Sequence, residues 1–185
     1  MDNAVTGLVH VRPATLDDVG AMAICHTRSI RDAYKGFLHP ADLAIFTEPE
    51  TAARIAGQIG SSDTVLVAVV AGQVVGHARW GMVDADYWPY QVLVHALFID
   101  PGHQRHRAGS ALLCECALGA YSGGHDGMMI GAFIDNKPAI EWYTRLGGRV
   151  VEEAPLEVGS NSYVSVFIAF DDLPGLCARL SSIPS

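Results

Sequence analysis

Short runs of β-branched and other apolar residues alternate with stretches of helical periodicity along this chain of 185 residues. The apolar runs have the length and the flanking turn residues of buried or half-buried strands. They lie at 9–12, 64–70, 74–80, 91–99, 128–133, 149–153 and 163–170. Apolar residues spaced three and four apart predict helices at about 15–34, 49–59, 109–121 and 136–146. This order of elements predicts a mixed α/β protein without an internal repeat.

The length fits a single domain. We expect this domain to span 1–185, with a core at about 9–170 and a tail at 171–185 that contains a short helix. Half of the residues are hydrophobic, but they come in short runs, never in the stretch of about 20 that a membrane span needs. The N-terminus carries Asp2 in place of basic residues and has no long apolar stretch, which argues against a secretory signal and for the cytoplasm.

The formal net charge is −8, which disfavours nucleic acid as a partner. An acidic surface weakly favours a cationic partner such as an amine. The four cysteines include no C-x-x-C pair, so we expect free thiols.

A turn after the strand at 91–99 enters a helix directly, through the residues 100–109. Such a turn presents several backbone N–H groups at a helix N-terminus, where the helix dipole favours an anion such as phosphate. The alternative is a tight turn with solvated basic residues. His103 and His106 have no Cys or acidic partner at ligand spacing, so no metal is expected here.

A second constellation begins at Asn136, which is followed by Pro138 and a predicted helix of about three turns. Tyr143 lies seven residues after Asn136, so both side chains share one face of that helix. Taken alone, the two residues are a helix cap and a half-buried aromatic side chain.

Together the two stretches resemble the signatures of the GNAT superfamily of N-acetyltransferases. The first signature is Gln/Arg-x-x-Gly-x-Gly/Ala, matched by Gln104 and Gly109, but Arg107 stands where the family usually has its first Gly. The second is Asn-x-x-Ala-x-x-x-Tyr-x-x-x-Gly, and here Asn136, Ala139, Tyr143 and Gly147 match in register. The departure at position 107 requires a backbone conformation that an L-residue can adopt.

The resemblance implies an α/β (α+β) GNAT fold, in which helices flank a mixed, mostly antiparallel central sheet of about six to seven strands. This sheet would be splayed at the strand before the cofactor turn. Acetyl-CoA is the implied cosubstrate, and no metal is implied. The implied cofactor-binding residues are Phe98, Ile99, Gln104, Arg105, His106, Arg107, Ala108, Gly109, Ser110, Asn136, Ala139 and Tyr143.

Transfer of an acetyl group to an amine needs a neutral amine, a donor to the thioester oxygen and a proton for the leaving thiolate. The resemblance makes the backbone N–H of Ile99 the expected donor, and the Tyr143 hydroxyl the expected proton donor. His95 is our first candidate for the general base, with Asp84 or Asp86 as alternatives. A chain of water molecules without a side-chain base also stays open.

For the acceptor, the family resemblance points to the connection between the first two helices, the strand before the cofactor turn and the last hairpin. Expected acceptor-binding residues in these regions are Tyr34, Phe37, Trp80 and Tyr90, together with Tyr87, Trp88 and the loop at 157–163. An ordinary aromatic core cluster or a homodimer interface is the alternative.

The predicted function is therefore transfer of acetyl from acetyl-CoA to a primary amine of a small molecule or a peptide N-terminus, through a ternary complex. The alternative is a GNAT-fold sensor or structural protein that binds acyl-CoA without catalysis.

Overall fold

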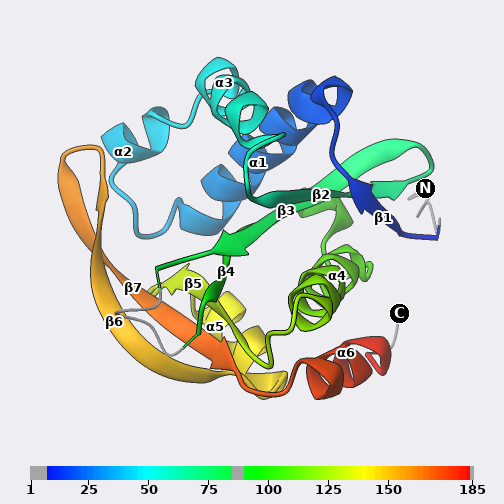
Figure 1. Cartoon of the computed structure of the whole chain (residues 1–185). Coiled ribbons are helices and arrows are strands. Elements are labelled where there is room, and N and C mark those ends of the chain that lie inside the picture. Colours follow the sequence, from blue (N-terminus) through cyan, green and yellow to red (C-terminus); the bar gives the residue numbers. More distant parts are fainter. Residues whose placement is uncertain (1–7, 85–89, 184–185) are drawn as a thin grey trace.

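A single seven-stranded sheet forms the centre of the computed structural model, which describes residues 8–84 and 90–183 (Figure 1). The strands are β1 (His10–Pro13), β2 (Thr64–Val70), β3 (Gln73–Met82), β4 (Val92–Ile99), β5 (Met128–Phe133), β6 (Arg149–Val158) and β7 (Asn161–Phe170). The helices are α1 (Val19–Tyr34), α2 (Pro40–Ala44), α3 (Glu48–Gln58), α4 (Ala108–Ser122), α5 (Lys137–Arg145) and α6 (Leu173–Ser181), with 3-10 turns η1 (Leu16–Asp18) and η2 (Pro101–His103).

The strand order is β1-β2-β3-β4-β5-β7-β6, and neighbouring strands are antiparallel except for β4 and β5, which are parallel. Helices α1 and α3 cover one face of the sheet and α4 covers the other (Figure 1). This arrangement confirms the expected mixed, mostly antiparallel sheet flanked by helices. Within the described residues, no helix combines the length and apolar character needed to cross a membrane.

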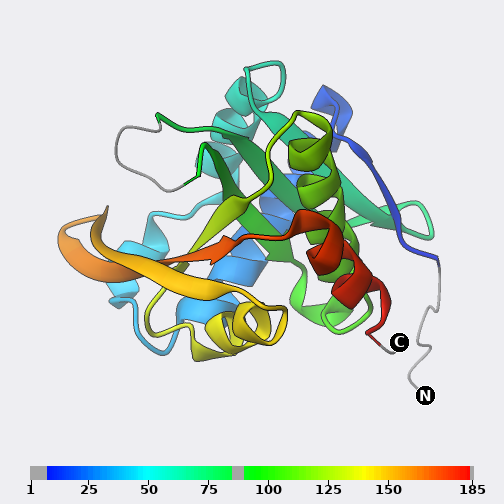
Figure 2. The ribbon, with the colours of Figure 1, turned by 60° about the horizontal axis from the view of Figure 1, so that its bottom comes forward.

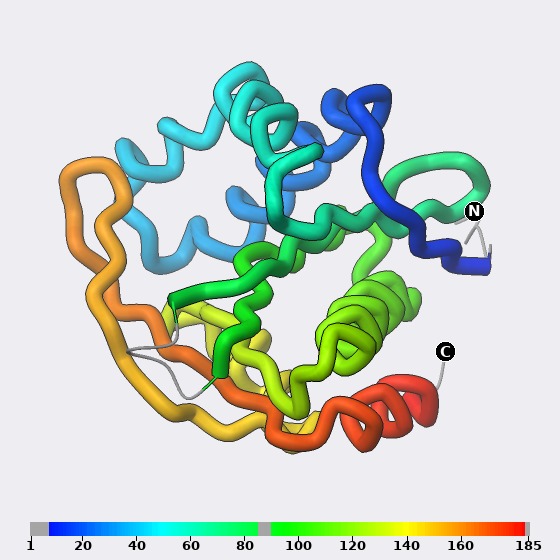
Figure 3. Tube along the Cα trace, viewed as in Figure 1, coloured from blue at the N-terminus to red at the C-terminus, as the bar shows by residue number. Residues whose placement is uncertain are grey.

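Two elements differ from the pattern-based expectation. A short helix, α2, forms between the first two predicted helices, where none was expected, because His39 caps it and Pro40 occupies its first turn. Strand β6 runs to Val158 and not to residue 153, and its extra residues pair with β7 as far as Asn161. The last two strands therefore form a long hairpin whose tip curves towards α2 (Figure 3).

The C-terminal segment, expected to be a tail, packs onto α4 as helix α6 (Figure 2). Its side chains Leu173, Leu176 and Leu180 are buried in the main core. Cys177 of α6 donates to the backbone oxygen of Cys114 on α4, and all four cysteines are free thiols, as expected. The helix thus completes the core on the α4 side of the sheet.

A buried polar pair joins α1 to the sheet on the opposite face. The Nδ1 atom of His26 lies 3.2 Å from Nε2 of His77 on β3, and both side chains are almost completely buried. Arg54 of α3 approaches Nε2 of His26 at 3.0 Å. Because an arginine only donates, His26 Nε2 must accept, which leaves Nδ1–H of His26 to donate to His77. Both imidazoles are therefore neutral in the fold.

Burial lowers the pKa of both imidazoles, of His26 to about 2 and of His77 to about 3. The unfolded chain binds protons at these histidines near pH 6.5, and the folded chain does not. Stability from this pair is therefore complete above pH 6.5 and is lost as the pH falls from 6.5 towards 3.

We predict that the free energy of unfolding falls by about 1.4 kcal/mol per pH unit for each imidazole once the pH is well below 6.5. Urea titrations between pH 7.5 and 5 measure this slope. The His77→Gln variant, which keeps an acceptor for His26 but cannot titrate, should reduce the slope. His10→Gln, at an exposed position in β1, is the matched control. An identical slope in wild type and His77→Gln would contradict the assignment.

Candidate functional site

Strands β4 and β5 separate shortly after they begin. Only Leu93 with Met129 and Val94 with Ile130 are paired, although β4 continues to Ile99 and β5 to Phe133. The backbone groups on this side of β4 have no β5 residue in register beyond Val94. Backbone donors and acceptors are rarely left without partners in a protein interior, so this opening suits a ligand with amide or carbonyl groups.

A β-bulge at His95 lies at the start of this opening. Strand β3 pairs Arg79 with Ala96 and Trp80 with Val94, so His95 is the extra residue of β4. Val92 and Val94 before the bulge, and Leu97 and Ile99 after it, belong to the core beneath α4. His95 therefore lies on the other face of the sheet, the face that α1 and α3 cover.

The bulge also decides which amides of β4 face the opening. The N–H of Asp100 donates to the Val75 oxygen across β3 at 2.9 Å. Because successive residues of a strand point their N–H groups to opposite sides, the amides of Leu97 and Ile99 face away from β3. Ile99 was expected as a donor from the sequence. Leu97 was not, although the same alternation gives its amide the direction of the Ile99 amide.

The remaining contacts of this end of β4 come from α1. The hydroxyl of Ser29 donates to the backbone oxygen of Ile99. Phe98 pairs with His77 in the β3 register, and its ring packs against His26 at a centroid distance of 4.2 Å. The Phe98 amide is thus on the β3 side, and its side chain helps to fix β4 beneath α1.

The turn that follows β4 is held by Asp100. Its carboxylate accepts from the Gly102 N–H at 3.0 Å and pairs with Arg28 of α1 at 3.0 Å. Helix α4 then begins at Ala108, after Arg107 as its N-cap residue. The exposed stretch from Gln104 to Arg107 thus leads directly to the N-terminus of a helix of 15 residues, the arrangement in which backbone N–H groups bind phosphate.

Arg107 adopts the left-handed conformation that its unusual position requires, with φ 65°, and Arg105 does the same. This region is open to L-residues but costs them more than glycine. The Arg107 guanidinium donates to the backbone oxygen of Ser181 at 2.8 Å. In this structure it therefore binds the C-terminal end of α6, where the helix dipole favours a cation.

Gly109 in the first turn of α4 is not required by packing. A Cβ atom there would meet Ile99 and Trp142 only at ordinary van der Waals distances of 3.6 and 3.7 Å, and its backbone φ is not positive. By contrast, a Cβ atom at Gly119 of the same helix would overlap the Trp80 ring. A glycine at position 109 also lets a ligand approach the backbone closely.

Helix α5 brings Asn136 and Tyr143 to the same side of the molecule. The side chain of Asn136 caps the helix by accepting from the Ala139 N–H at 3.4 Å. Tyr143 is buried, and its ring lies 5.1 Å from the ring of Trp142 and 6.4 Å from that of Phe170. Burial raises the pKa of its hydroxyl well above 10, with a further contribution from Tyr34. Tyr143 therefore stays protonated at neutral pH.

The expected base His95 is half-buried, and its surroundings disfavour the charged imidazole. Burial lowers its pKa, and so does the nearby charge of Arg79, which forms an ion pair with Asp63. A neutral imidazole is the form that accepts a proton. Asp84 is part of the described chain, whereas Asp86, Tyr87 and Trp88 lie outside the described residues.

The structure separates the residues expected to bind an acceptor into two groups. Tyr34 and Phe37 lie together with Phe133 at the end of β5, at centroid distances of 5.0 and 5.6 Å from it, and Tyr163 of the last hairpin joins them at 5.9 Å. These four rings are called the aromatic cluster below. Neither Phe133 nor the contact made by Tyr163 was foreseen from the sequence.

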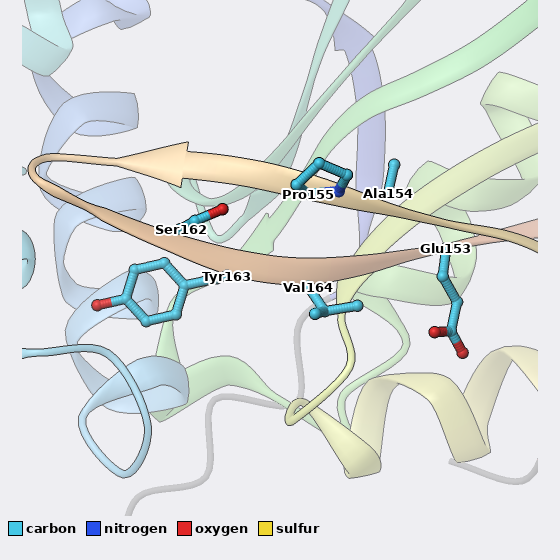
Figure 4. Close-up of a pocket in the computed structure, with 6 residues that line it drawn as sticks. All are labelled: Glu153, Ala154, Pro155, Ser162, Tyr163 and Val164. Carbon is cyan, nitrogen blue, oxygen red and sulfur yellow. The ribbon is translucent and has the colours of Figure 1, made fainter.

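Trp80 and Tyr90 lie elsewhere. Trp80 packs onto Gly119 of α4, and Tyr90 covers Gly127 at the beginning of β5, away from the opening. A shallow hollow on the β6–β7 hairpin borders the aromatic cluster at Tyr163 (Figure 4). It is lined by Glu153, Ala154, Pro155, Ser162, Tyr163 and Val164. His103 and His106 belong to no group of three or more metal-ligating side chains within the described part of the chain.

The model of the family described as the acetyltransferase (GNAT) domain matches residues 61–147. No curated protein sequence matches the chain.

Similar folds occur among solved structures. The PaiA N-acetyltransferase of Thermoplasma acidophilum, in complex with coenzyme A, has a TM-score of 0.70 and 13% identity over 86% of this chain and 98% of its own. YncA of Salmonella typhimurium, a putative acetyltransferase solved with acetyl-CoA, has a TM-score of 0.65 and 20% identity over 89% and 94%. The ribosomal-protein-S18-alanine N-acetyltransferase of Escherichia coli has a TM-score of 0.65 and 16% identity over 88% and 92%. At these identities the likeness concerns the fold.

The left-handed backbone conformation of Arg107 should affect the stability of variants at this position. Arg107→Gly and Arg107→Ala both remove the guanidinium that binds Ser181, but only glycine adopts this conformation without strain. We expect the glycine variant to be more stable than the alanine variant by about 1 kcal/mol in chemical denaturation. Equal stabilities would show that position 107 does not hold the left-handed conformation.

Proposed function

Because the chain belongs to the GNAT superfamily of acetyltransferases, we propose that it is an N-acetyltransferase that binds acetyl-CoA in the opening between β4 and β5. It would transfer the acetyl group directly to a primary amine in a ternary complex. The observation that carries this proposal is the separation of the two strands beside a helix N-terminus, with Tyr143 on the adjoining helix.

The cofactor would bind along β4 and across the turn. The N–H groups of the turn and of the α4 N-terminus would hold the pyrophosphate, assisted by the charges of Arg105 and Arg107. The unpaired edge of β4 offers Leu97 and Ile99 to the amide groups of the pantetheine arm and to the thioester oxygen. Asn136 and Ala139, at the start of α5, would contact the same arm on the side of Tyr143.

The chemistry then follows from the protonation states of the side chains. Neutral His95 accepts the proton of the attacking amine, and the tetrahedral oxyanion is stabilised by an amide of β4. The C–S bond breaks, and Tyr143 donates its hydroxyl proton to the leaving thiolate. The raised pKa of Tyr143 keeps that proton in place until the thiolate forms.

The acceptor would bind at the aromatic cluster, between the α1–α3 connection, the end of β5 and the last hairpin. Small-molecule amines and peptide N-termini both belong to this proposal. The E. coli neighbour, whose name describes an S18-alanine N-acetyltransferase, is consistent with the second class. The four free thiols support the cytoplasm as its compartment.

Gly109→Ala tests cofactor binding apart from folding. Because the structure has room for the added methyl group, the melting temperature of the free protein should stay within about 2 °C of wild type. Affinity for acetyl-CoA, measured by calorimetry, should fall at least tenfold, because the methyl group would occupy the position of the ligand. A variant that binds acetyl-CoA as tightly as wild type would contradict the proposed site.

Tyr143→Phe tests the proton donor. We expect kcat for amine-dependent thiol release to fall about 100-fold, with little change in the Kd for acetyl-CoA. Tyr121→Phe, at a half-exposed position on α4, should leave kcat unchanged. If kcat is retained in Tyr143→Phe, another group protonates the thiolate. If the wild type binds acetyl-CoA but releases no thiol with any amine, the non-catalytic alternative is correct.

His95→Gln tests the base. With a weakly basic amine that is neutral throughout the assay, kcat/KM of the wild type should fall below a pKa that lies under 6.5, because burial lowers the pKa of His95. The variant should lose this dependence and most of its activity. Should Asp84→Asn abolish the pH dependence instead, the carboxylate would be the base.

A further inference from the structure

A buried carboxylate on α2 binds the tip of the last hairpin. The side chain of Asp42 is almost completely buried, and the hydroxyl of Tyr163 donates to its Oδ2 at 2.6 Å. The side-chain amide of Asn161 donates to the same oxygen at 2.8 Å, and the Ser160 N–H approaches Oδ1 at 3.3 Å. These contacts, with Tyr163 the largest contributor, lower the pKa of Asp42, so it stays ionised at neutral pH.

The hydroxyl of Tyr163 is held from both sides. It donates to Asp42 and accepts from the backbone N–H of His39, the cap residue of α2, at 2.9 Å. Figure 4 shows the Tyr163 side chain projecting away from the hairpin strands. Gly159 lets the tip approach, because a Cβ atom there would overlap the Asp42 carboxylate, and its φ of 60° favours glycine. We call this set of contacts the Asp42 clasp.

The clasp adds polar contacts to a small apolar cluster, in which Val158 near the hairpin tip is buried and Leu43 of α2 packs against it. Asp42 and Tyr163 are 121 residues apart in the chain. Helix α2 has five residues, too few to be stable alone, and the hairpin tip extends beyond the remainder of the sheet (Figure 3). The positions of both segments therefore depend on contacts such as those of the clasp.

The position of the clasp connects it to the proposed active site. The ring of Tyr163 packs edge-on against Phe133, and Phe133 packs against Tyr34. Tyr34 in turn lies near enough to contribute to the raised pKa of Tyr143. A row of contacting aromatic rings thus leads from the clasp to Tyr34, on the side of the proposed proton donor.

We infer that the Asp42 clasp positions the acceptor side of the active site. By fixing α2 to the hairpin tip it keeps the aromatic cluster assembled before the amine arrives, so it acts on acceptor binding and not on the cofactor or the chemical step. Asp42 and Tyr163 are positioning residues in this role. The inference rests on the proposed function, because it assumes that an amine binds at the aromatic cluster.

Two conservative substitutions test the clasp. Tyr163→Phe removes only the hydroxyl, and Asp42→Asn removes the charge and replaces one acceptor oxygen with an NH2 donor. With the best acceptor from a panel of alkylamines, aralkylamines and peptides, each should raise the acceptor KM about tenfold, with kcat within about twofold of wild type and an unchanged Kd for acetyl-CoA. The double variant should raise the acceptor KM by less than the product of the two single effects, because both substitutions perturb the same hydrogen bond between Tyr163 and Asp42.

The matched control is Asp171→Asn. It breaks the exposed ion pair with Arg149 at the other end of the same hairpin and should leave the acceptor KM unchanged. Hydrogen exchange at 159–163 should be faster in both clasp variants and not in the control.

Several results would overturn the inference. An unchanged acceptor KM in Tyr163→Phe and Asp42→Asn would do so while leaving the proposed function intact. An equal rise in the control variant would point to a general effect of the hairpin. A joint loss of stability, kcat and acetyl-CoA affinity would show that the clasp only supports the fold. A wild type without amine-dependent turnover would contradict the proposed function and, with it, this inference.

Discussion

The separation of β4 from β5 after two residue pairs is the constraint on which the other features of the site depend. A parallel pair in the middle of a sheet would normally continue, because unpaired backbone groups in a protein interior are costly. Here the bulge at His95 changes the course of β4, and the Ser29 hydroxyl satisfies the Ile99 oxygen. The edge that remains is polar backbone within an apolar surrounding, which is well suited to an extended ligand rich in amides.

Both sides of this opening are held in place by packing that has no direct part in the chemistry. On one face, the His26 and His77 pair and the Phe98 ring fix β4 beneath α1. On the other face, α4 and α6 bury the leucines of the C-terminal helix, and Arg107 connects the turn to the end of α6. A preorganised opening reduces the reorganisation that binding and catalysis would otherwise require.

The sequence predicted the elements with strong periodicity and the residues that a motif identifies by spacing. Strands β2 and β5 begin and end where the apolar runs do, and Asn136 and Tyr143 are on the predicted helix. Helix α2 was missed because five residues cannot show a helical period. The length of β6 was underestimated because Pro155 interrupts the run and most of the residues around it are exposed, so they lack the pattern of a half-buried strand.

The features of the site that the sequence did not predict also lack a local pattern. The bulge at His95 has no local signature in the sequence, and the Asp42 clasp depends on contacts between residues far apart in the chain. Trp80 and Tyr90 were grouped with Tyr34 and Phe37 because all are aromatic and lie in regions that the family resemblance assigned to the acceptor. In the structure, Trp80 faces α4 and Tyr90 lies at the start of β5, whereas Tyr34 packs at the end of β5.

A crystal structure of the complex with acetyl-CoA tests the central claim most directly. We predict that the pantetheine arm lies between β4 and β5 and that the pyrophosphate lies at residues 104–109. The thioester oxygen should be within hydrogen-bond distance of the Leu97 or Ile99 amide. Acetyl-CoA bound outside this opening, or an opening closed by paired strands, would contradict it.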